Sequence, residues 1–135
     1  MSLIQRSFIT ALVAAHLAAN FWHSGAHTEL AINLSPIQIT FVIIAILVAP
    51  IAAGGLVWTR FVAFGLWLLV LSMTAALLFG VYHHYILVSP DNIAYLPDGT
   101  HEAHARFIDS AASLALLELA TALYGAFCLG VRAAR

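Results

Sequence analysis

The stretch HLAANFWHSGAH, residues 16–27, decides how this chain can fold, because it places polar side chains inside a long apolar run. Its polar residues His16, Asn20, His23 and His27 are separated by steps of four, three and four positions. On an α-helix of about 3.6 residues per turn, this spacing puts all four side chains on one face. Imidazoles are costly in lipid unless they pair, bind a ligand or face water. The stretch therefore predicts a helix whose polar face is a ligand-binding stripe or a polar seam.

The composition of the rest of the chain indicates an integral membrane protein. Of its 135 residues 63% are hydrophobic and only 8% are charged, whereas soluble proteins carry about 25% charged residues. A helix needs about 20 apolar residues to span the hydrocarbon layer. Four segments meet this length, at about 5–27, 37–58, 61–86 and 105–131. We expect an all-α membrane protein, an antiparallel bundle of four transmembrane helices that forms a single domain over residues 1–135.

Local signals mark where the predicted helices begin and bend. Ser35 followed by Pro36 is typical of a helix N-cap and first turn, and Thr100 is a second candidate N-cap. Pro50 lies inside the second apolar segment, where its missing N–H and its ring are expected to distort the helix.

Arginine placement predicts the orientation of the bundle. In a four-pass chain Arg6, Arg60, Arg132 and Arg135 fall on one side and Arg106 on the other. The positive-inside rule then puts both termini in the cytoplasm, which we take to be that of a bacterial inner membrane. The outer, periplasmic face receives six of the seven histidines. The chain has no lysine and a formal net charge of −1, so it offers no basic patch for nucleic acid.

The histidines near the outer face are candidate metal ligands. His23 and His27 are four residues apart and can present two nitrogens to one ion. Side chains from facing helices complete such sites in helix bundles, and His83, His84 and His104 are the candidates here. Ideal helical phase puts His83 on a small-residue face and turns His84 about 100° away, which favours His83. A nitrogen-rich ligand set of this kind suits Zn, Cu or Fe.

Two carboxylates are candidates for catalytic roles. Asp109 can act as a metal ligand or support a ligand from behind, or it can belong to a surface ion-pair ladder with Glu102 and Arg106. Glu118 falls near mid-bilayer, about 21 Å above the cytoplasmic arginines when each residue adds ~1.5 Å, as does Asn20. We expect Glu118 to face the interior and to meet Asn20 or His16, two residues that we also assign to cofactor binding.

These residues lead to one main hypothesis and several competing ones. The main hypothesis is a small membrane metalloprotein, a metal-dependent oxidoreductase or hydrolase that acts on a lipophilic, membrane-soluble molecule. A second is a haem b protein with an axial histidine from the first helix (His16 or His23) and another from the third (His83 or His84). A third is a non-enzymatic metal-handling protein, an accessory subunit of a larger membrane complex or a homo-oligomer. A fourth is a belt of interfacial histidines and aromatic residues that binds no ion.

Overall fold

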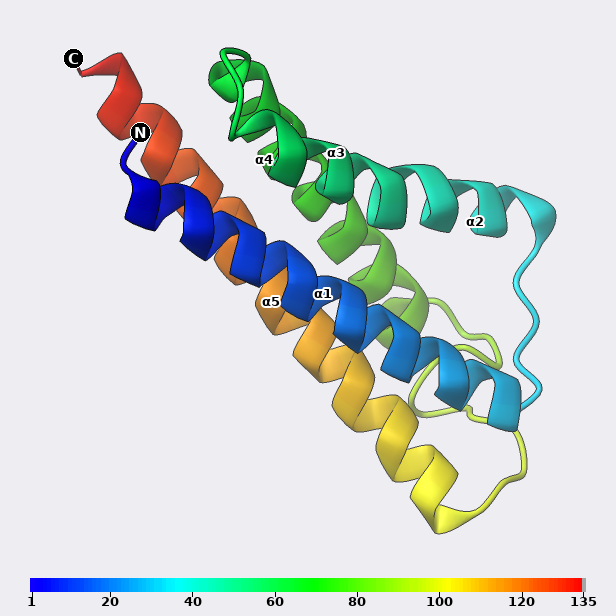
Figure 1. The fold of residues 1–135 in the computed structure, drawn as a ribbon. Coiled ribbons are helices and arrows are strands. Elements are labelled where there is room, and N and C mark those ends of the chain that lie inside the picture. The colour runs from blue at the N-terminus through cyan, green and yellow to red at the C-terminus, as the bar shows by residue number, and fades with distance from the viewer. Residues whose placement is uncertain (135) are drawn as a thin grey trace.

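The computed structural model describes residues 1–134, and every regular element in that range is helical (Figure 1). The elements are α1 (Leu3–Glu29), α2 (Pro36–Phe41), η1 (Val42–Val48), α3 (Ala49–Leu56), α4 (Val62–Val81), η2 (Tyr82–Ile86) and α5 (His101–Ala133), where η marks a π-helical segment. Since α2, η1 and α3 follow one another without a break, as do α4 and η2, the chain forms four long helices. Their positions match the four predicted segments, and Arg135 lies outside the described residues.

Three of the four helices are long and apolar enough to cross a membrane, which points to a membrane protein. They are Pro36–Leu56, Val62–Ile86 and His101–Ala133. The helix α1 is also long, at 27 residues, but it is not among the three. Its histidines and asparagine lower its hydropathy, so the expectation that this helix also spans the membrane stays a prediction.

Consecutive helices run in opposite directions, and α1 lies along α5 (Figure 1). The N-terminus, the C-terminal end of α5 and the turn between α3 and α4 all lie at one end of the molecule (Figure 1). Towards the other end, α1 and α2 diverge before the linker of residues 30–35 joins them. We call the end with both termini the closed end, and the end where α1 and α2 diverge the open end.

The closed end holds the main apolar core. Its buried members come from all four helices: Ile9, Val13, Ala53, Val57, Val62, Leu66, Leu69, Met73, Ala122 and Cys128. The indole N–H of Trp58 donates a hydrogen bond to Thr10 Oγ1 (2.9 Å), which ties the α3–α4 turn to α1. Burial of these apolar side chains stabilises this end of the structure.

Side chains cap the helices where the sequence predicts it. Ser35 caps α2 in a reciprocal capping box with Gln38, and Pro36 occupies the first turn. The hydroxyl of Thr100 accepts from the backbone N–H of Ala103 at the start of α5. Both predicted N-caps are confirmed.

The helix α1 runs past Ser24-Gly25 and ends in a Schellman motif. The N–H of Ile32 donates to the carbonyl of His27 (3.0 Å), and that of Ala31 donates to Thr28 (3.2 Å). Ala31 takes the left-handed conformation that this motif needs, with φ 50°. The backbone around His27 is therefore held by the end of its own helix.

Two helices widen locally into π-helical turns. Before Pro50, the N–H of Ala49 donates to the carbonyl of Ile44, an i→i−5 bond. The wider turn accommodates a proline that lacks an N–H and would crowd the carbonyl of Ile46 in a regular helix. At the end of the third helix, Leu87 N–H donates to Tyr82 across the same interval (2.8 Å). This second wide turn contains His83 and His84.

Candidate metal centre

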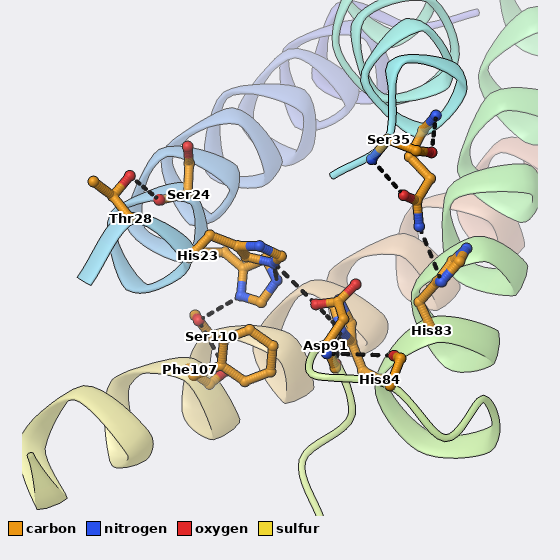
Figure 2. Close-up of polar contacts among 12 residues, drawn as sticks. His23, Ser24, Thr28, Ser35, His83, His84, Asp91, Phe107 and Ser110 are labelled. Atoms are coloured by element: carbon orange, nitrogen blue, oxygen red, sulfur yellow. Dashed lines mark hydrogen bonds and ion pairs between the residues drawn. The ribbon is translucent and has the colours of Figure 1, made fainter. Parts of the chain in front are cut away.

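Three histidines from two helices converge at the open end. His23 and His27 come from α1 and His84 from η2, and one ligand nitrogen from each lies within 4.8 Å of the others. The Nε2 atoms of His23 and His27 are 3.1 Å apart, and the ring centroids of His23 and His84 are separated by 4.8 Å. Figure 2 shows the cluster between the end of α1, the end of η2 and the facing turn of α5.

The spacing of these nitrogens fits a single ion. Zinc binds imidazole nitrogens at about 2.0–2.1 Å, so two ligands of a tetrahedral ion lie about 3.3–3.4 Å apart. The 3.1 Å separation of the His23 and His27 nitrogens is close to that value. Small side-chain rotations would therefore bring all three rings into contact with one transition-metal ion.

The orientation of the His23 ring is set by Ser110 of α5. The Ser110 hydroxyl donates its one proton to the carbonyl of Phe107 (3.1 Å). It must therefore accept the second hydrogen bond, a 2.8 Å contact from Nδ1–H of His23 (Figure 2). We infer that His23 carries its proton on Nδ1, which leaves the Nε2 lone pair pointing at His27. Metal-bound histidines typically have such an outer hydrogen bond.

The His84 ring is oriented by a backbone carbonyl. Its Nδ1 lies 3.0 Å from the carbonyl oxygen of Asp91, and since a carbonyl only accepts, Nδ1 must carry the proton. The Nε2 atom of His84 then keeps a free lone pair. Two of the three histidines thus have the tautomer that a metal ligand needs.

The Asp91 carboxylate lies against the same cluster. Its Oδ1 is 3.2 Å from His27 Nε2 and 3.2 Å from His84 Nδ1. The residue is 5% exposed, and neither carboxylate oxygen accepts a well-aligned hydrogen bond from the described residues. A buried carboxylate without such partners is unfavourable, so these oxygens are available to a cation. Asp91 is a candidate fourth ligand.

A cavity of about 580 Å³ adjoins the cluster. It is lined by the second half of α1, the linker after it, the second helix, α4 and one face of α5. His23, His27, His84 and Asp91 line it, and so does Glu118. The histidine cluster therefore faces an open space large enough for a small molecule.

A second polar group lies deeper in the same cavity. Glu118 is 4% exposed, and its Oε1 is 3.2 Å from Nε2 of His16, which is fully buried. The amide of Asn20 donates to the His16 carbonyl (2.9 Å) and lies 3.1 Å from His16 Nε2. The expected contact between Glu118 and the first helix is confirmed, with His16 as the direct partner.

The expectation that His83 faces the site and His84 points away was wrong, because the two residues have exchanged these roles. His83 contacts Gln38 of α2 (3.4 Å) and the ring of Phe79, with ring centroids 4.3 Å apart. His84 is the buried one, next to His23 and His27. The expected phase assumes 3.6 residues per turn throughout, whereas the wide turn of η2 shifts the inward position by one residue.

Two more of the predicted site residues lie away from the cluster. His104 contacts the loop before α5, with its Nε2 2.9 Å from the carbonyl of Pro97. Asp109 is exposed on α5, although the next residue, Ser110, faces the cluster. Arg106 pairs with Glu102 (3.1 Å) and with Glu29 of α1. The expected ladder on this surface thus contains Glu102 and Arg106 and continues to Glu29 in place of Asp109.

Sequence reasoning missed Asp91 and Ser110. Asp91 lies in the SPDN turn of residues 89–92, where an aspartate is an ordinary turn residue. Ser110 is a small residue in an apolar helix face. The sequence places Asp91 and Ser110 near the same membrane face as the outer histidines. Neighbouring polar residues share this position, so it does not single out these two.

No protein-family model, curated protein or solved structure matches this chain, so the geometry of its own residues is the basis for a functional assignment.

Proposed function

We propose that this chain is a small integral membrane metalloprotein in which His23, His27 and His84 bind one transition-metal ion. The convergence of the three histidines carries the proposal, because their ligand nitrogens lie within 4.8 Å of one another. The outer hydrogen bonds of His23 and His84 support it, since each leaves Nε2 free. Asp91 supplies a carboxylate as the fourth ligand.

The donor set favours a particular group of metals. Three imidazoles and one carboxylate suit Zn, Cu or Fe, whereas Mg and Ca prefer oxygen ligands alone. A metal ion also fits better than haem b between His23 and His84. With ring centroids 4.8 Å apart, these two rings leave no space for a porphyrin between them, since two axial nitrogens alone are about 4 Å apart across an iron.

The adjoining cavity favours an enzyme over a purely structural site. Catalytic metal sites keep an open position beside a pocket, whereas structural sites are closed. Redox or hydrolytic chemistry on a membrane-soluble substrate is the reaction class that we propose. Glu118, at the other end of the cavity, is the candidate proton acceptor. Asp109 is not part of this proposal because its side chain is exposed.

Metal analysis of two adjacent variants tests the proposal. We expect His84→Ala to lose bound metal almost completely and His83→Ala to keep the wild-type amount, because only His84 belongs to the cluster. The protein is purified in detergent, loaded with Zn, Cu or Fe in parallel, and measured by elemental analysis. His83→Ala is a matched control, since it removes the same side chain one position away.

Three outcomes separate the competing functions. Equal metal content in His84→Ala, His83→Ala and the wild type would refute the metal centre. A Soret band in the absorption spectrum of the wild type would select haem. Metal bound without turnover of any lipophilic substrate would favour a metal-handling protein.

We propose further that the protein lies in a bacterial inner membrane with both termini in the cytoplasm, so that the metal centre faces the periplasm. In a Cys128→Ala background, a cysteine at Tyr95 should react with a membrane-impermeant reagent in intact cells, and one at Arg60 should not. Both positions are exposed. The reverse labelling pattern would place the histidine cluster on the cytoplasmic side.

A further inference from the structure

We infer that the 580 Å³ cavity binds a lipophilic molecule with an uncharged, hydroxyl-bearing head, such as an alkylated phenol, and that Glu118 accepts the hydrogen bond from this hydroxyl. The inference deepens the proposed function by naming the ligand class for the cavity beside the metal centre. It does not require the metal, because Glu118 and its partners lie at a different level of the cavity.

The walls of the cavity are divided by polarity. The polar side chains come mainly from α1 and from Glu118 of α5. The apolar lining comes mainly from the second helix and α4 and includes Ile39, Val42, Ile46, Ala76 and Phe79. A ligand that fits both walls must have an apolar body and a polar group at one side.

The charges in the cavity exclude an anionic head. Its lining contains two carboxylates, Glu118 and Asp91, and no arginine or lysine. A phosphate or carboxylate head would be repelled by these groups and would find no cation to pair with. A hydrogen-bond donor without negative charge matches the acceptors that are present.

Glu118 offers one free acceptor to such a donor. Its Oε1 contacts His16, whereas Oε2 has no hydrogen-bond partner among the described residues. The residue is more than nine-tenths buried and borders the cavity. A carboxylate oxygen without a protein partner, on a residue that borders the cavity, can accept a hydrogen bond from a ligand. The hydroxyl of the ligand would supply it.

A lipophilic ligand can reach the cavity from the side. The helices α1 and α2 diverge towards the open end (Figure 1), and the cavity lies between them. On α2 and η1, the side chains of Ile37, Ile39, Ile43 and Ile44 are exposed and suited to lipid contact. About seven residues of α1 separate Asn20 from His27, so the Glu118 level lies about 10 Å from the metal level. The ring of a bound phenol would therefore lie between Glu118 and the metal centre.

Binding of 4-hexylphenol tests the inference against its methyl ether, 4-hexylanisole, which has the same shape without the donor. Wild-type protein in phosphatidylcholine nanodiscs is titrated with each, and binding to empty nanodiscs is subtracted. We expect the phenol to bind at least ten-fold more tightly than the ether. Glu118→Gln should reduce this preference several-fold, because the neutral amide is a weaker acceptor than a carboxylate.

A cavity-filling pair of variants locates the ligand. Ala115 lines the cavity, and the neighbouring Leu116 faces outward with 69% exposure. Ala115→Phe should abolish phenol binding, and Leu116→Phe should leave it unchanged. Helical content by circular dichroism confirms that both variants fold, and Glu118→Gln still tests the inference if Ala115→Phe does not.

The outcomes distinguish this inference from the metal proposal. Wild-type protein stripped of metal by a chelator should still prefer the phenol. Equal binding of phenol and ether, or displacement of the phenol by phosphatidylglycerol, would overturn the inference even if metal is bound. Preferential phenol binding in a protein that binds no metal would keep the inference and refute the metal centre.

Discussion

The closed end and the open end of this molecule differ in the polarity of the side chains that they bury. At the closed end, residues such as Ile9, Leu69 and Met73 are fully buried against other apolar side chains. At the open end, His23, His84 and other polar groups are buried beside a smaller apolar cluster, and a cavity separates the helices. The members of that cluster are Ala26, Leu30, Ile32, Ala103 and Phe107. The closed end can stabilise the helices as a unit. The open end can therefore retain a cavity and ligand atoms without hydrogen-bond partners.

The contrast is visible within α1 itself. In its first half the buried positions are Ile9 and Val13, and in its second half they are His16, Ala19, His23 and Ala26. The same helical face therefore changes from packing to polar contacts as the bundle opens. Each of the two histidines has a partner on α5, which is Glu118 for His16 and Ser110 for His23.

The largest expected effect is on stability at the closed end. Leu69→Ala removes a fully buried side chain and should lower the free energy of unfolding by about 2–5 kcal/mol. Val42→Ala, which trims the already open cavity wall, should cost less than half as much. Denaturant titration of both variants in mixed micelles, followed by circular dichroism, measures the difference. Equal losses would mean that the open end contributes as much to stability as the closed end.

A smaller loss is expected where the two ends meet. Glu118→Leu removes the carboxylate next to the fully buried His16 and leaves the Asn20 amide as its remaining side-chain contact. The substitution should cost about 1–3 kcal/mol. Glu118→Gln preserves the shape and a hydrogen bond, so its unfolding free energy should stay close to the wild type. The same titration compares the two variants. A Glu118→Leu protein as stable as the wild type would show that the contact between Glu118 and His16 does not stabilise the fold.

The third prediction concerns the metal centre without touching a ligand. Ser110→Ala removes the acceptor that orients His23 and should weaken metal binding about 10–100-fold. Ser113→Ala, three residues further along α5, is the control, because its hydroxyl contacts only the carbonyl of Asp109. Competition with a chelator of known affinity provides the measurement. Unchanged affinity in Ser110→Ala would mean that the His23 tautomer does not depend on this hydrogen bond.

The sequence by itself determined the four helices and part of the polar interior. Apolar length, capping residues and proline act locally, so the helix positions and the caps Ser35 and Thr100 could be predicted from neighbouring residues. The regular spacing from His16 to His27 predicted the polar face of α1, because that helix keeps one period throughout. The contact of Glu118 with α1 followed from its depth and phase.

Only the tertiary structure decided which groups complete the site. The choice of His84 over His83 depends on a wide helical turn, and a regular period cannot predict such a local change. Asp91 reaches the cluster through the path of a loop, and Ser110 through the rotation of α5 against α1. The cavity exists because α1 and α2 diverge, which depends on how whole helices pack and has no signature in any single segment.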